Sequence, residues 1–105
     1  MTFKEISLLC NYISKDFAEA IFRLLASHHN ISASEAASRL DLHIRTVQEF
    51  LEIMAEFHIL KKEEVFEKKR PYFRYSLEKK KINILIDLDE LFEKNTKRNY
   101  NFKIR

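Results

Sequence analysis

A chain of 105 residues with 46% hydrophobic residues, 33% charged residues and a net charge of +3 has the composition of one ordinary globular domain. The single cysteine excludes an internal disulfide framework, and the lack of glycine disfavours the phosphate-cradling loops of nucleotide-binding folds. We expect a cytoplasmic protein without a membrane span, since no N-terminal segment resembles a secretory leader and no apolar run approaches roughly 18 residues.

Two amphipathic helices are predicted in the N-terminal quarter of the chain. In residues 2–13, Thr2 and Glu5 have the spacing of a capping box, and apolar residues follow at helical intervals. Cys10 is expected to be a small buried side chain rather than a nucleophile, since no base partner is recognisable. Ser14 is expected to cap the second helix, whose broad apolar face should be buried.

A short helix, a tight turn and a longer helix follow. Ser32 and Glu35 form a second capping box, and Asp41 occupies the turn, where it tolerates a left-handed backbone. The longer helix is expected at about 43–57, and 100° between successive residues gives it one apolar face. The predicted core residues on that face are Val47, Phe50, Leu51 and Met54.

After the longer helix the apolar period changes to two, which predicts a β-hairpin around a polar connector at 67–71. Its second strand contains Tyr72, Phe73 and Tyr75, which are expected to pack in the core and across strands rather than stack on bases. A last helix is expected at 87–95, with an N-terminal cap at Asp87. A basic tail follows at 97–105.

Positive charge is concentrated in two stretches of the chain. Residues 61–81 contain nine Lys or Arg and four Glu, and the tail at 97–105 contains four Lys or Arg and no acid. A local basic surface can attract polyanions even when the whole molecule is nearly neutral. Both stretches are therefore candidate contacts for nucleic acid, although a basic hairpin can also be only a solvated edge.

The predicted order of elements is the layout of a winged helix-turn-helix. The stretch from Ile31 to Leu51, the motif Phe57-His-Ile-Leu-Lys-Lys62 and the stretch Lys69-Arg-Pro-Tyr-Phe-Arg-Tyr-Ser-Leu77 resemble the ArsR- and MarR-type transcriptional regulators. The resemblance covers roughly residues 16–77. Asp41 and His58 depart from it, since both stand where that family commonly has glycine.

The resemblance implies a mainly α protein with a small β-hairpin. It also implies a single winged helix-turn-helix domain at residues 1–96, with its core at residues 16–77. The extra helices at 2–13 and 87–95 correspond to elements that commonly form the dimer seam, so a homodimer is expected. The implied function is that of a transcriptional regulator whose partner is double-stranded DNA. The implied regulator is not an enzyme and needs no cofactor. A metal site is not expected either, since no spaced Cys, His and Asp cluster is present.

In such regulators the start of the longer helix enters the major groove of DNA. The residues that this nominates here are His43, Ile44, Arg45, Gln48 and Glu49. The wing residues expected to contact phosphates are Lys68, Lys69, Arg70 and Arg74. The exposed face of the helix, however, carries one base, Arg45, and three acids, Glu49, Glu52 and Glu56, which opposes its approach to phosphates. The alternative function is therefore a winged helix that binds another protein and not DNA.

Overall fold

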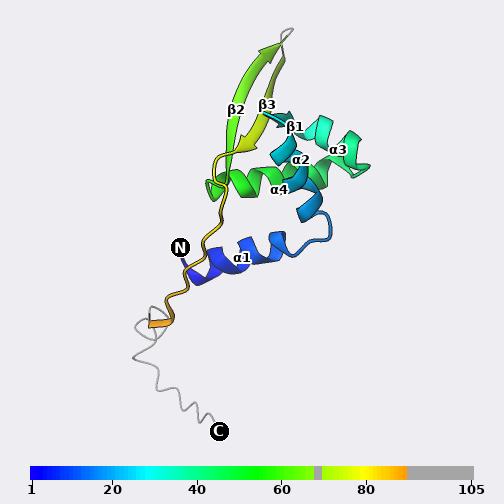
Figure 1. Ribbon diagram of the computed structural model, residues 1–105. Coiled ribbons are helices and arrows are strands. Elements are labelled where there is room, and N and C mark those ends of the chain that lie inside the picture. Colours follow the sequence, from blue (N-terminus) through cyan, green and yellow to red (C-terminus); the bar gives the residue numbers. More distant parts are fainter. Residues whose placement is uncertain (68–69, 90–105) are drawn as a thin grey trace.

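The computed structural model describes residues 1–67 and 70–89. Within these ranges four helices precede the hairpin of a small antiparallel sheet, whose short first strand lies between the second and third helices (Figure 1). The helices are α1 (Phe3–Ile13), α2 (Ala18–Ser27), α3 (Ala33–Leu40) and α4 (Ile44–Glu56), and the strands are β1 (Ile31–Ser32), β2 (Leu60–Glu67) and β3 (Arg70–Leu77). The predicted fold class, mainly α with a β-wing, is confirmed, and the topology is that of a winged helix.

Local chemistry explains where the helices begin and end. The hydroxyl of Thr2 accepts the backbone N–H of Glu5, whose carboxylate accepts the backbone N–H of Thr2, so the predicted capping box is confirmed. Asp41 ends α3 with a φ of 55°, in the left-handed conformation expected for this turn. His58, at the turn after α4, also has a positive φ, of 60°.

Two predictions near the first helix were wrong. Ser14 ends α1 and does not cap α2: its hydroxyl donates to the carbonyl of Asn11, while α2 begins after Phe17 without a side-chain cap. Cys10 is exposed and not buried. The helical phase of α1 brings the neighbouring Leu9 fully into the core, which turns Cys10 outward.

The hairpin differs from its prediction because its strands continue into the expected connector. Phe66 pairs with Pro71, and Glu67 pairs with Arg70, so the connection is reduced to residues 68–69, which lie outside the described ranges. Strand β1, which was not predicted, adds a third strand by pairing with β3 over two residues only. Pro71 lies beyond that short pairing, where β3 is an edge strand and a missing N–H is tolerated.

The hydrophobic core is centred on Phe50 of α4. Rings from the first two helices and their connection surround it, with centroids 6.4 Å (Tyr12), 5.7 Å (Phe17) and 5.5 Å (Phe22) from the Phe50 ring. All four predicted core residues of α4 are fully buried, and Tyr75 brings β3 into the same core. The buried face of α4 therefore holds α1, α2 and the wing together.

The chain beyond the sheet has no regular strand or helix up to Asp87. The carboxylate of Asp87 accepts the backbone N–H of Asp89 at 3.0 Å, which is the contact of an N-terminal helix cap. The rest of the helix predicted at 87–95, and the tail at 97–105, lie outside the described residues. Among the helices that are described, none combines the length and apolarity needed to cross a membrane.

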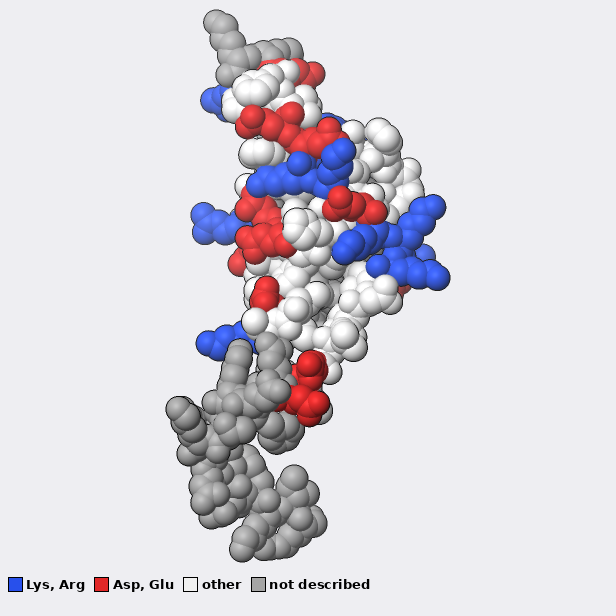
Figure 2. Space-filling model, turned by 90° about the vertical axis from the view of Figure 1, so that its left-hand side faces the viewer, with Lys and Arg blue, Asp and Glu red and all other residues white. Residues whose placement is uncertain are grey.

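Charged side chains of both signs lie on the face shown in Figure 2. Lys and Arg side chains lie next to Asp and Glu side chains over its upper and middle parts, and one group of Lys and Arg side chains gathers at the right-hand edge. Two of the ion pairs among the described residues are highly exposed, Arg23 with Glu19 at 2.7 Å and Lys61 with Glu63 at 3.5 Å. Individual exposed pairs of this kind contribute little to stability.

The position of Phe50 predicts a large difference between two phenylalanine substitutions. Phe50→Ala should lower the free energy of unfolding by about 3–5 kcal/mol, because it leaves a cavity among three aromatic rings. Phe66→Ala should change the free energy of unfolding by less than about 0.5 kcal/mol, because the Phe66 ring is 75% exposed. Urea denaturation followed by circular dichroism measures both values, and equal losses would contradict a core centred on Phe50.

Candidate nucleic-acid interface

The side of helix α4 that is predicted to read DNA lies at the surface of the molecule. Arg45, Gln48 and Glu49 are exposed, and Ile44 is 46% exposed. His43 is the N-cap of the helix, and its Nδ1 accepts the backbone N–H of Arg45 at 3.2 Å. The other ring nitrogen of His43 therefore carries the proton in the neutral imidazole and is a donor. The structure thus brings all five predicted base-contact residues together on one exposed surface.

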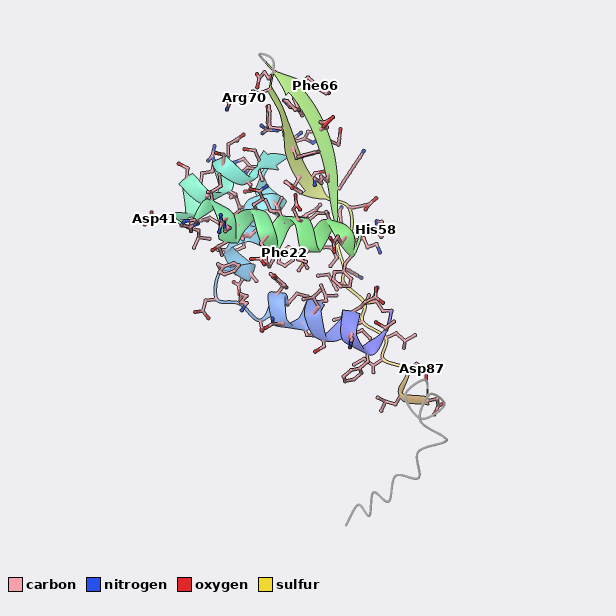
Figure 3. The ribbon with its side chains drawn as sticks, turned by 180° about the vertical axis from the view of Figure 1, so that it is seen from behind. Phe22, Asp41, His58, Phe66, Arg70 and Asp87 are labelled. Atoms are coloured by element: carbon pink, nitrogen blue, oxygen red, sulfur yellow. The ribbon has the colours of Figure 1, made fainter. Side chains whose placement is uncertain are left out.

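The tip of the wing lies far from the helix-turn-helix. Figure 3 shows Phe66 and Arg70 at the outer end of the hairpin, while Asp41 and His58 lie at opposite ends of α4. Arg70 is exposed and stands opposite Glu67 in the strand register. The predicted phosphate contacts Lys68 and Lys69 lie outside the described residues.

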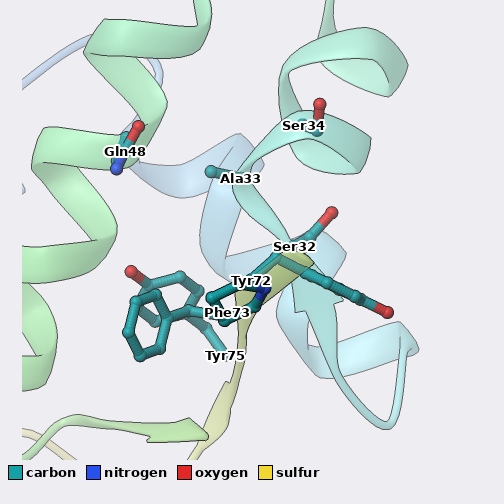
Figure 4. Close-up of a pocket in the computed structure, with 8 residues that line it drawn as sticks. Ser32, Ala33, Ser34, Gln48, Tyr72, Phe73 and Tyr75 are labelled. Atoms are coloured by element: carbon teal, nitrogen blue, oxygen red, sulfur yellow. The ribbon is translucent and has the colours of Figure 1, made fainter. Parts of the chain in front are cut away.

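A groove of about 520 Å³ runs between the wing, the start of α3 and α4 (Figure 4). Its polar lining includes Ser32, Ser34 and Gln48, and its aromatic lining comes from β3. Gln48 also lines a shallower hollow on α4 together with Arg45, Glu49 and Glu52. The exposed face of α4 and the groove beside the wing therefore meet at Gln48 and form one continuous surface.

One of the three acids on the exposed face of α4 is paired within the molecule. The Glu52 carboxylate accepts a hydrogen bond from Nζ of Lys62 on β2 at 3.0 Å. The same ammonium lies 4.2 Å from the centroid of the Phe73 ring on β3, so Phe73 packs across the strands as expected, but at 38% exposure it is not part of the core. Burial raises the pKa of Tyr75 to about 12, and the Glu52 carboxylate contributes to that increase.

A second acid of this face lies beside the first helix. Burial raises the pKa of Tyr12 on α1, and the nearby carboxylate of Glu49 raises it further. Glu49 and Tyr12 also line a common hollow between α1 and α4. Arg45, by contrast, forms no ion pair with any residue in the described ranges. Of the three acids on this face, Glu52 alone forms an ion pair within the described residues, and the neutral phenol of Tyr12 leaves the charge of Glu49 in place.

Arg74 was predicted to contact phosphate, and its guanidinium is engaged inside the molecule. Nη1 donates to the Glu35 carboxylate at 2.7 Å and to the Tyr72 hydroxyl at 3.5 Å. Nε donates to the side-chain oxygen of Asn30, and Nη2 donates to the Asn30 carbonyl at 3.3 Å. The side chain is only 22% exposed. A phosphate would have to compete with these contacts, so the predicted role of Arg74 stays a prediction.

The same contacts extend the predicted cap of α3. The hydroxyl of Ser32 accepts the backbone N–H of Glu35 at 3.2 Å, as expected. The Glu35 carboxylate, however, turns to Arg74 and to the Ser32 hydroxyl. The hydroxyl of Tyr72 in turn donates to Glu67 at 3.0 Å, near the wing tip. A line of polar contacts thus runs from the outer wing to α3.

A family model named HVO_A0114 matches residues 19–79, more than half of the chain. The chain belongs to the HVO_A0114 family. No curated protein matches the chain significantly. The HVO_A0114 segment extends from α2 through the end of the hairpin, so it contains the groove, the exposed face of α4 and the Arg74 contacts. Helix α1, with Tyr12, lies outside it.

The sequence predicted no metal centre, and it did not predict the two ion pairs between the wing and the helices. In the part of the chain that the structure describes, no three His, Cys, Asp or Glu side chains gather closely enough to hold a metal ion. The pairing of Glu52 with Lys62, and of Glu35 with Arg74, was missed. Glu35 was interpreted only as a helix cap, and the strand register that aligns Arg74 with it cannot be obtained from local spacing.

The Glu35–Arg74 contact predicts an acid-sensitive part of the stability. The hydrogen bond from Arg74 holds the pKa of the Glu35 carboxyl below its ordinary value. A lowered folded-state pKa stabilises the fold above the ordinary glutamate value, and this stabilisation is lost as pH falls through the folded pKa. The melting-temperature difference between wild type and Glu35→Gln should therefore be largest near neutral pH and should shrink in acid.

Thermal denaturation at a series of pH values measures this difference. Glu19→Gln is the matched control, because Glu19 pairs with Arg23 where both side chains are about three-quarters exposed. Its melting temperature should stay close to that of wild type at every pH. A Glu35→Gln difference that is the same at pH 7 and pH 3 would contradict the assignment of the ion pair.

Proposed function

We propose that this protein is a cytoplasmic, DNA-binding transcriptional regulator of the ArsR/MarR kind, and that it has neither a catalytic activity nor a cofactor. In this proposal α4 enters the major groove of double-stranded DNA, and the wing contacts phosphates. The observation that carries it is the exposed face of α4, where Arg45 and Gln48 are available beside the groove and Glu52 is paired with Lys62. Membership of the HVO_A0114 family and the winged-helix topology are compatible with it.

The exposed side chains of α4 have the chemistry for reading base pairs. A guanidinium such as that of Arg45 can donate two hydrogen bonds to guanine, and the amide of Gln48 can pair with adenine. The exposed Ile44 suits a thymine methyl group. The free ring nitrogen of His43, next to these residues, can donate to a phosphate and so help to set the register.

Internal pairing weakens the electrostatic objection to this function. The exposed face of α4 contains three acids, but Lys62 offsets the charge of Glu52, which leaves the charges of Glu49 and Glu56. The phosphate attraction that DNA binding requires is then assigned to the basic wing residues Lys68, Lys69 and Arg70.

Mobility shifts on random duplex DNA over a series of salt concentrations test the wing assignment. The triple substitution of Lys68, Lys69 and Arg70 by Ala should weaken binding about equally on every sequence. The slope of log affinity against log salt should fall by about 2–3, since each phosphate contact contributes roughly 0.9. Arg45→Ala should instead change the preferred base at one position, by about 1–3 kcal/mol. No shift for the wild type at low salt would favour a protein-binding winged helix.

We further propose that the regulator is a homodimer joined through its flanking elements. Phe3 and Leu8 of α1 are 49% and 40% exposed, and the chain after the wing adds exposed apolar residues. These are Ile82, Ile84, Leu85, Ile86 and Leu88. A second copy covering this surface would remove it from water. Two-fold symmetry would then place two α4 helices about 34 Å apart, one turn of DNA.

Analytical ultracentrifugation tests the dimer at micromolar concentration. The wild type should sediment at twice the 12.7 kDa mass of one chain. Leu8→Asp should shift it to the monomer, because a carboxylate in an apolar interface is costly to bury. Phe66→Asp, which places the same charge at the exposed wing tip, should remain a dimer. A wild type that sediments as a single chain would rule the dimer out.

A further inference from the structure

Two ionic contacts join the wing to the helices from opposite faces of the sheet. On one face Lys62 of β2 reaches Glu52 of α4, and on the other Arg74 of β3 reaches Glu35 of α3. Lys62 pairs with Tyr75 in the strand register, and Arg74 is the residue before Tyr75. Since successive side chains of a strand point to opposite faces, the two contacts lie at the same level of the hairpin on its two sides.

The Arg74 contact has the features of a fixed support. Its guanidinium donates to α3 through Glu35 and to the segment before β1 through Asn30, so one side chain ties together three parts of the chain. The side-chain exposures of 22% for Arg74 and 42% for Glu35 leave the pair partly shielded from water. A planar guanidinium that is held at three nitrogens has little freedom to turn toward a ligand.

We propose that Arg74 is a positioning residue: together with the Lys62–Glu52 pair it fixes the angle between the wing and α4, and it does not itself contact DNA phosphate. This inference rests on the proposed DNA-binding function and refines it. The basic wing tip reaches phosphates only if the hairpin holds its place relative to the helix in the major groove. The charge of Arg74 is already neutralised by Glu35, so its contribution to affinity comes through geometry.

The variant Glu35→Gln separates positioning from direct contact. If Arg74 contacts phosphate, removing the Glu35 charge frees the guanidinium, and binding should become tighter with a steeper salt dependence. If Arg74 positions the wing, the same substitution loosens it. Affinity for duplex DNA should then fall about 3-fold to 30-fold, with a salt slope that is unchanged or shallower.

The matched control is Glu64→Gln on the same hairpin. It changes the net charge by the same amount, but the exposed Glu64 stands opposite Phe73 on the other face of the strands from Arg74, and it forms no ion pair with any described residue. Its affinity should equal or slightly exceed that of the wild type. Tighter binding by Glu35→Gln, or no change in its affinity, overturns the proposal.

A distance measurement tests the same contact without DNA. Spin labels on Phe66→Cys at the wing tip and Ser38→Cys on α3, in a Cys10→Ser background, report the wing position by electron double resonance. The distance distribution should broaden in Glu35→Gln and not in Glu64→Gln. If the wild type fails to bind DNA, the proposed function is wrong while a broadened distribution still supports the positioning role. An unchanged distribution overturns that role whatever the DNA result.

Discussion

Burial of one face of α4 is the constraint on which the other parts of the structure depend. Phe50 lies at the centre of that face, surrounded by rings from α1, α2 and their connection. Tyr75 packs into the same core from β3, which brings the wing against the helix. Because a helix with one fully buried face has its remaining side chains facing outward, the core also determines which residues α4 offers to a partner.

Acidic residues in this protein have structural uses that a charge count conceals. Glu52 and Glu35 both lie near the surface proposed to meet DNA, where a carboxylate should repel phosphates. Each instead accepts a hydrogen bond from a basic wing residue, and each pair ties a strand to a helix. The acids are then part of the framework, and the basic residues that pair with them are correspondingly less available to a ligand.

Because these ion pairs occupy some of the basic side chains, fewer residues are available to a ligand than the sequence predicted. Ile44, Arg45 and Gln48 are exposed on α4, as is Glu49 beside Tyr12, whereas Arg74 is held by Glu35. Affinity would then depend on the wing tip, and sequence preference on a short stretch of α4. The groove beside Gln48 joins these two regions into one surface.

The sequence by itself determined the features that depend on spacing within one element. The capping box at Thr2, the left-handed turn at Asp41 and the buried face around Phe50 follow from local periodicity and turn chemistry. The pairing of Arg74 with Glu35, 39 residues apart, was decided only by the tertiary structure, as was the short strand β1. A side chain's partner depends on strand register and on how elements pack, and neither is encoded in the spacing of neighbouring residues.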